Sequence, residues 1–288
     1  MTKRILIIGG NGQLGNCIRK IASDFEDRFE FNFTDSATLD ITDDAAVSDC
    51  FYDYKPHFCI NASAYTAVDL AEIESEKAFA VNADGLANLA EACAENQCVL
   101  IHVSTDYVFD GDTNISYSED NFTNPQGVYG ASKLKGEELA MDLNPKTIII
   151  RTSWLYSEFN KNFLKTMLNL FSVKEELGVV ADQFGQPTNA NDLAETIMKI
   201  IDSEPKTYGV FHFSNYPETS WYGFAEKIAE FSGSDIKLNS ITTEQFPTPA
   251  KRPKRSTLAL DKIEKTYKIE LKHWENSLDE CIQILKKS

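Results

Sequence analysis

The feature that most constrains the fold is a glycine-rich turn that follows an apolar run at the start of the chain. Residues 3–10 read KRILIIGG, and Gly9, Gly12 and Gly15 form a G-x-x-G-x-x-G pattern. The continuous apolar run predicts a buried parallel strand, and the spacing of residues 14–25 predicts a helix after it. Backbone N–H groups at such a strand–turn–helix junction can approach a pyrophosphate. The turn therefore predicts a dinucleotide site that includes Gly9, Asn11, Gly12, Gln13, Leu14 and Gly15.

Strands and helices alternate through the first half of the chain. Further strands are predicted at residues 28–35, 57–63, 98–109 and 146–156, and helices at 75–96 and 127–143. The second half is predicted to be mainly helical, at residues 163–171, 191–202, 220–231 and 277–287. Alternation of this kind indicates an α/β chain with a doubly wound, mainly parallel sheet. We predict a dinucleotide-binding domain at 1–153 and a smaller substrate lobe at 154–288, with part of 189–213 returning to the first domain.

Composition excludes several classes of protein. The chain has 288 residues, 42% of them hydrophobic, and a net charge of −16, which disfavours binding to nucleic acid. Six scattered cysteines without a C-x-x-C pair read as reduced thiols, and four dispersed histidines offer no metal site. The apolar run at the N-terminus is too short for a signal peptide, and no stretch reaches membrane-spanning length. We therefore expect a cytoplasmic protein that binds a small molecule.

Three residues outside the glycine turn are of the types that a dinucleotide-binding enzyme uses. Asp35 ends the second predicted strand, at the distance after the turn expected for a partner of the ribose hydroxyls. Tyr129 and Lys133 lie four residues apart in VYGASK, on one face of a predicted helix. Taken alone, that pair is more commonly a half-buried tyrosine beside a solvated lysine. Ser104 and Thr105 end the strand that precedes the helix, and together with the glycine turn they favour a catalytic role for the pair.

These motifs together resemble those of the extended short-chain dehydrogenase/reductases, which have a Rossmann-type fold. CINASAYTAVDLAE, VSTDYVFDG, RTSWLY and KRPKRSTLALDK are more specific and resemble the dTDP-4-dehydrorhamnose reductase family. The resemblance covers nearly the whole chain. It implies NAD(P)H-dependent reduction of the C4 keto group of dTDP-4-dehydro-L-rhamnose to dTDP-L-rhamnose, for cell-surface polysaccharides.

The resemblance also implies roles for individual residues. Tyr129 would give a proton to the forming alkoxide, Lys133 would lower the pKa of that tyrosine and hold the nicotinamide ribose, and Thr105 would bind the keto oxygen, with Ser104 as the neighbouring candidate. Asp40 and Ile41 would lie beside adenine, and Ala62, Ala64 and Tyr65 along the cofactor. Substrate contacts would come from Asp106, Tyr107, Trp154 and, through the pyrophosphate, Arg252.

Several alternatives stay open. Asp35 favours NADH, but the family often accepts NADPH, so the cofactor is predicted only as NADPH or NADH. Some members bridge a dimer through Mg²⁺ with glutamates, and Cys17 and Asn191 stand at those positions here. We therefore predict no metal and a possible homodimer without one. Rival functions are a non-catalytic, NADP-binding regulatory subunit of a methionine adenosyltransferase and another nucleotide-sugar epimerase or reductase.

Overall fold

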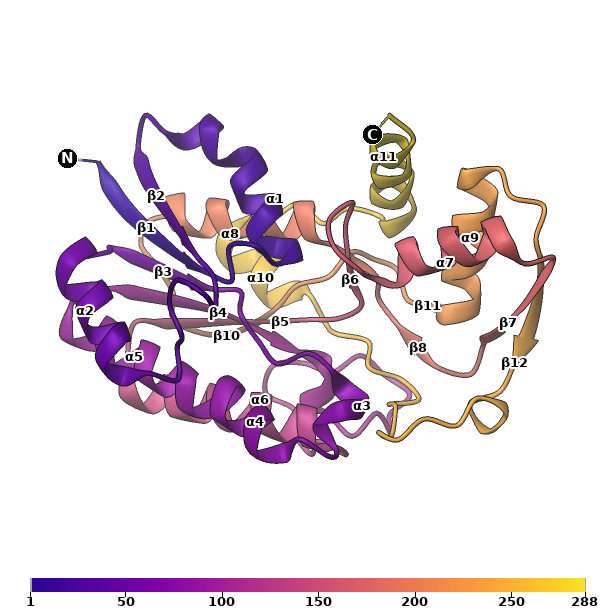
Figure 1. The fold of residues 1–288 in the computed structure, drawn as a ribbon, viewed down its shortest axis with the longest axis horizontal. Coiled ribbons are helices and arrows are strands. Elements are labelled where there is room, and N and C mark those ends of the chain that lie inside the picture. The colour runs from indigo at the N-terminus through magenta and orange to yellow at the C-terminus, as the bar shows by residue number, and fades with distance from the viewer. Residues whose placement is uncertain (1, 288) are drawn as a thin grey trace.

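The computed structural model describes residues 2–287, which form a large parallel sheet covered by helices and a smaller lobe beside it (Figure 1). The sheet has six strands in the order β10-β5-β4-β3-β1-β2. In chain order they are β1 (Lys3–Ile8), β2 (Phe29–Thr34), β3 (Phe58–Asn61), β4 (Val99–Thr105), β5 (Thr147–Thr152) and β10 (Gly209–His212), and every pairing is parallel. The predicted α/β fold is confirmed.

Strand order places a crevice next to β1. From β1 the chain moves outward to β2 on one side and then returns to β3 on the other. The loops that leave β1 and β3 therefore diverge at the carboxyl ends of these strands, which is where open α/β sheets bind ligands. The glycine turn follows β1, and Ala62 to Tyr65 follow β3.

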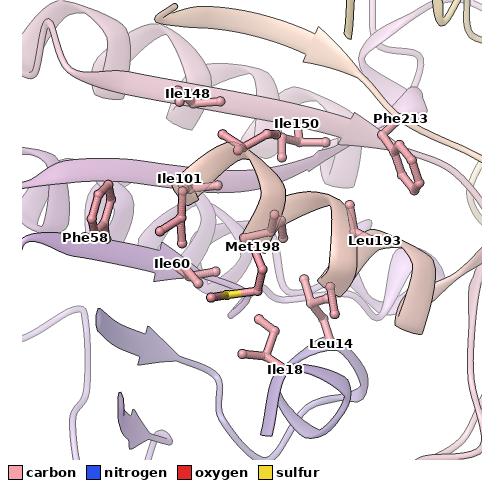
Figure 2. Packing of buried hydrophobic residues seen from close by; sticks show 14 of the residues in the cluster. Leu14, Ile18, Phe58, Ile60, Ile101, Ile148, Ile150, Leu193, Met198 and Phe213 are labelled. Carbon is pink, nitrogen blue, oxygen red and sulfur yellow. The ribbon is translucent and has the colours of Figure 1, made fainter. Parts of the chain in front are cut away.

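Alternation of side chains along the strands builds one core on each face of the sheet. Ile5 and Ile7 point to the face covered by α1 (Gln13–Ile21), α8 (Ala190–Asp202) and α10 (Asp261–Tyr267). Leu6 and Ile8 point to the face covered by α2 (Asp44–Tyr54), α5 (Gly85–Glu95) and α6 (Val128–Leu143). Figure 2 shows the first core, where Leu14 and Ile18 of α1 meet Leu193 and Met198 of α8 over the strands. Both faces are sealed, as a parallel sheet requires.

The smaller lobe has its own core. Helices α7 (Phe163–Val173), α9 (Trp221–Ser232) and α11 (Trp274–Lys287) surround buried Tyr156, Leu164, Phe224 and Leu278. Three short strand pairs accompany them: β6 (Leu155–Tyr156) with β9 (Thr188–Asn189), β8 (Phe184–Gly185) with β11 (Thr219–Ser220), and β7 (Glu176–Val180) with β12 (Lys237–Ile241). None of the helices in residues 2–287 combines the length and apolar character needed to cross a bilayer.

The structure differs from the sequence prediction in several elements. The predicted helix 75–96 is α4 (Ser75–Phe79), a π-helical turn η2 (Ala80–Asp84) and α5 in succession. The predicted strand 146–156 breaks at Trp154, whose φ is +47°. Helices α2 and α10 and the four-residue helix α3 (Val68–Ala71) were not predicted. Short 3-10 turns occur at η1 (Ala22–Phe25), η3 (Asp106–Val108) and η4 (Thr243–Gln245).

Two segments of the second half pack with the large sheet. α8 and β10 bring residues 190–212 back to it, and α10 adds Ile263 and Tyr267 to the same core. We therefore propose that the first domain comprises residues 1–153, much of the predicted return at 189–213, and α10. The lobes are interleaved because the chain leaves the sheet after β5 and returns twice.

Candidate active site

A cavity of about 810 Å³ opens at the carboxyl ends of the strands and reaches into the smaller lobe. The predicted residues that line it come from six separate parts of the sequence. The predicted residues that line it are Gly9, Asn11, Gly12, Gln13, Leu14, Asp35, Asp40, Ile41, Ala62, Ala64, Tyr65, Ser104, Thr105, Asp106, Tyr107, Tyr129, Lys133 and Trp154. Gly15 and Arg252 are the predicted residues outside that lining. The volume lies within the range of natural small-molecule sites.

The glycine turn is shaped for close approach. Gly9 has a φ of +80°, and a Cβ there would lie 2.8 Å from the backbone nitrogen of Ser63. A side chain at Gly15 would collide with the carbonyl oxygen of Gly9 at 2.4 Å, so Gly15 acts by packing α1 against the turn. The smaller lobe docks here as well, since Asn160 donates to the carbonyl of Asn11 (2.8 Å) and Asn162 donates to Gln13 (2.9 Å).

Asp35 lies directly after β2 and faces the turn. Its carboxylate accepts hydrogen bonds from Asn11 and from the backbone N–H groups of Ala37 and Thr38, the latter two at 3.0 Å. The Thr38 hydroxyl, its backbone N–H and these other donors lower the pKa of Asp35. The group is therefore a fixed negative charge at the end of β2. Asp40 is held similarly, by the backbone N–H (2.9 Å) and hydroxyl (2.8 Å) of Thr42.

Tyr129 stands in the first turn of α6, close to the end of β4. Gly130 allows this, because a Cβ on it would lie 2.2 Å from the carbonyl oxygen of Tyr107. The Tyr107 and Tyr129 rings meet edge to face, with centroids 5.6 Å apart. Glu72 accepts from the Val128 backbone N–H (2.9 Å) and so binds the first turn of α6 from a distant loop. Burial raises the pKa of Tyr129 to about 12, although a hydrogen bond with Thr105 acts to lower it.

Lys133 lies one turn after Tyr129 on α6, and its amine faces β4. Its Nζ lies 2.9 Å from Nε2 of His102 and donates to the Val103 carbonyl (2.8 Å). Burial lowers the pKa of Lys133 to about 7. The amine is therefore turned toward β4.

Polar groups at the end of β4 surround this pair. Thr105 donates to Asp106 (3.1 Å), and burial raises the pKa of Asp106 to about 6. Burial also raises the pKa of Tyr107. The hydroxyl of Ser104 is buried and has no hydrogen-bond partner among residues 2–287. An unpartnered buried hydroxyl in a cavity wall is a position where a polar ligand restores a lost hydrogen bond.

Trp154 enters the cavity from the junction of the lobes. Its ring stacks on Trp221 with centroids 3.6 Å apart and planes at 9°, and a Cβ on Gly185 would lie 2.7 Å from it. One face of the indole is therefore already covered by protein. A ligand in the cavity could stack only on the part of the Trp154 indole that Trp221 and Gly185 do not cover.

Arg252 lies outside the cavity lining. Its guanidinium donates to Asp69 (2.8 Å) and to the carbonyl oxygen of Ala250 (3.5 Å). Burial raises the pKa of Tyr107, and the positive charge of Arg252 acts against that rise. A phosphate would have to compete with Asp69 for it.

Comparison with known proteins shows which family the chain belongs to. The family model described as RmlD substrate binding domain matches residues 3–287. The chain belongs to the RmlD family. A dTDP-4-dehydrorhamnose reductase of Aggregatibacter actinomycetemcomitans is 44% identical over 96% of this chain and 97% of that protein. A Streptomyces antibioticus relative, named a probable dTDP-4,6-dihydroxy-2-methyloxan-3-one 4-ketoreductase, is 34% identical over 96% and 94%.

Solved structures of RmlD-family proteins agree with the fold. A dTDP-4-dehydrorhamnose reductase of Clostridium acetobutylicum superposes with a TM-score of 0.94 at 44% identity, covering 98% of this chain and 99% of that one. One of Bacillus anthracis, solved in complex with NADP, gives 0.95 at 37% identity, covering 99% and 100%.

The two positions predicted to replace metal-binding glutamates lie on α1 and α8, which pack against each other in this RmlD-family chain. Cys17 is buried on α1. Asn191 accepts from Lys20 (3.2 Å) and donates to Glu158 (2.8 Å), and the Lys20 ammonium lies 2.8 Å from that carboxylate. Within residues 2–287 no group of three or more His, Cys, Asp or Glu side chains is arranged to hold a metal ion.

Sequence reasoning missed other members of the site. Trp221 and Lys161 line the cavity from the smaller lobe, and His102 lies behind it on β4. Trp221 carried a weak signal as an aromatic residue at a helix start. Lys161 and His102 carried none, because their places depend on how the loop after β6 docks and how β3, β4 and α6 meet.

Proposed function

We propose that this chain reduces the C4 keto group of dTDP-4-dehydro-L-rhamnose with NAD(P)H, which yields dTDP-L-rhamnose. One observation carries the proposal: Thr105, Tyr129 and Lys133 share a single cavity with the glycine turn, in a chain of the RmlD family. The names of the relatives give the substrate, and the NADP in the Bacillus anthracis structure supports the cofactor.

The residues present fit a dinucleotide. The backbone of the glycine turn is exposed at the N-terminus of α1, and no side chain at Gly9 or Gly12 blocks it. Asp35 would hold the adenosine ribose, with Asp40 and Ile41 beside the base. Ala62, Ala64 and Tyr65 would lie along the cofactor after β3, and Lys161 faces the same space.

The chemistry follows from where protons are held. The hydride is supplied by the reduced nicotinamide when cofactor is bound. Thr105 would orient the keto oxygen, and Tyr129 would protonate the alkoxide. With its pKa raised to about 12 by burial, the phenol keeps its proton at neutral pH and so has one to give, and a nearby positive charge that lowers this pKa would make it a stronger acid. Lys133, turned from β4 toward the ribose, would stabilise the phenolate left behind.

Tyr129→Phe tests this assignment. We expect kcat to fall about 10²- to 10⁴-fold, the usual contribution of a positioned acid, with cofactor binding retained. Tyr54→Phe is a matched control, since within residues 2–287 its hydroxyl donates to the carbonyls of Ile5 and Glu30 and lies outside the cavity lining. Turnover is followed by NADPH oxidation and the product by NMR, which separates C4 reduction from epimerisation. Full activity in Tyr129→Phe would refute the mechanism.

Arg252 remains a proposed partner of the substrate pyrophosphate. Substrate would draw the guanidinium from Asp69, which is partly exposed and so exchanges at small cost. Arg252→Ala should raise KM for the dTDP-sugar and leave cofactor affinity unchanged. An unchanged KM would show that the arginine only anchors residues 250–252 to α3.

Three further predictions stay predictions. These are the cytoplasmic location, a homodimer without a bridging metal, and a contact of Trp154 with the sugar. A chain that bound NADPH but turned over no dTDP-sugar, and instead bound a methionine adenosyltransferase, would favour the regulatory alternative.

A further inference from the structure

A buried hydrogen-bond chain runs behind the cavity through His102. Asn61 of β3 and His102 of β4 are direct neighbours in the parallel register, and both are about 1% exposed. The side-chain amide of Asn61 lies 3.1 Å from Nδ1 of the imidazole, and Nζ of Lys133 lies 2.9 Å from Nε2. The imidazole therefore connects Asn61 of the sheet to Lys133 of α6.

The orientation of the Asn61 amide is fixed by Ser63. The carbonyl oxygen Oδ1 of Asn61 accepts from the backbone N–H of Ser63 (3.0 Å) and from its hydroxyl (2.7 Å). A backbone N–H can only donate, so Oδ1 must face Ser63 and the NH₂ group must face His102. Nδ1 of His102 is therefore an acceptor without a proton.

This orientation determines the tautomer of His102. A neutral imidazole without a proton on Nδ1 carries it on Nε2, which faces Lys133. An Nε2–H group needs an acceptor, and an ammonium group has none, whereas a neutral amine offers its lone pair. The remaining N–H groups of the amine can donate to the Val103 carbonyl, which lies 2.8 Å away.

We propose that His102 is a positioning residue that holds Lys133 as a neutral amine in the cofactor-free protein, so that cofactor binding takes up one proton. The inference rests on the proposed role of Lys133 at the nicotinamide ribose. When Lys133 turns from His102 to the cofactor, its amine gains a proton from solvent and becomes the ammonium that the phenolate needs.

The charges around the pair agree with this state. Burial lowers the pKa of Lys133 to about 7 and holds that of His102 well below its usual range. Glu137, one turn along α6, favours the ammonium, but its carboxylate is engaged by Arg151 of β5 at 2.6 Å. Tyr129 and Asp106 are the other titratable groups of this region, and burial disfavours the charged form of each.

Calorimetry of NADPH binding in phosphate and in Tris measures the proton uptake, because the two buffers differ in ionisation enthalpy. At pH 8 the wild type should take up about 0.9 proton per NADPH, falling steeply by pH 6 where the lysine is already charged. Lys133→Met should remove the uptake. Binding heats that do not depend on the buffer would overturn the proposal.

Asn61→Asp tests the tautomer directly. An aspartate there keeps the shape, accepts from Ser63 and also accepts Nδ1–H from His102, which frees Nε2 to accept from an ammonium. We expect the uptake at pH 8 to fall several-fold. Asn144→Asp is the control: that amide is equally buried, donates to the Cys98 carbonyl and has no hydrogen bond to a histidine within residues 2–287. Equal uptake in Asn61→Asp and wild type would overturn the role of His102.

A measurement without any variant guards against misfolding of Asn61→Asp. With ¹⁵N-labelled histidine only four side chains contribute, and the ring nitrogens of His102 should report the Nε2–H tautomer in the cofactor-free protein. The Nδ1–H tautomer would overturn the inference. Tyr129→Phe tests the proposed function separately, so failure of one is distinguishable from failure of the other.

Discussion

Glu137→Gln should destabilise the protein far more than a surface glutamate would. Glu137 and Arg151 are each about 5% exposed or less, and the guanidinium makes three hydrogen bonds to the carboxylate at 2.6–3.1 Å. Breaking a buried pair by removing one partner costs about 3–5 kcal/mol, because the other charge is left uncompensated. The glutamine can still accept one hydrogen bond from Arg151, so we expect a loss near the lower end, about 3 kcal/mol.

The assay is urea unfolding followed by circular dichroism. Glutamine and glutamate have nearly equal helix propensity, so the change in free energy of unfolding reports the pair and not α6 itself. Glu138→Gln is the adjacent control, since its partner Lys135 is 3.7 Å away and both side chains are more than half exposed. It should change stability by less than about 0.5 kcal/mol.

A double variant separates the pair from its surroundings. Glu137→Leu with Arg151→Leu should be less destabilised than the sum of the single variants, because no charge is left buried alone. The reasoning fails if Glu137→Gln and Glu138→Gln lose similar stability, or if the double variant is simply additive.

Three further predictions concern the cavity. Gly130→Ala should cost about 1–3 kcal/mol in unfolding experiments and lower kcat, because the new methyl group would press α6 away from the Tyr107 carbonyl. Asp35→Ala should raise the NADPH/NADH ratio of kcat/KM about tenfold, since it removes a charge that repels a 2′-phosphate; an unchanged ratio would count against Asp35 at the ribose. Asp106 has its pKa raised to about 6, so the folded chain binds this proton more tightly than the unfolded chain, and its contribution to stability should fall as pH rises from about 4 to 6. Asp106→Asn should lack that part of the pH dependence.

Local sequence patterns were enough for five of the six strands of the sheet, all except β10, and for most of the residues that line the cavity. The apolar run of β1 is followed by glycines, and that of β4 ends in Ser104 and Thr105. Parallel strands bring these carboxyl ends together at one edge of the sheet. Helix α2 escaped prediction because DAAVSDCFYDY mixes small, acidic and aromatic residues without a clear apolar stripe. α10 has only seven residues and gave too short a pattern.

The charge states of the site could not be predicted from spacing. The four-residue interval places Tyr129 and Lys133 on one helix face, but the direction in which the lysine points depends on His102 and Val103 of a strand thirty residues earlier. The break at Trp154 was also hidden, since RTSWLY reads as a continuous strand and nothing in that pattern marks the left-handed backbone (φ +47°) at Trp154.

The late arrival of β10 bears on how this chain folds during synthesis. β10 covers the edge of β5, and α10 seals the core beneath both. Until residue 212 has left the ribosome, β5 presents a row of unpaired N–H and C=O groups that could pair with a strand of another chain. The glycine turn and α6 are therefore synthesised before the sheet is complete, and the protein is most exposed to aggregation during this interval.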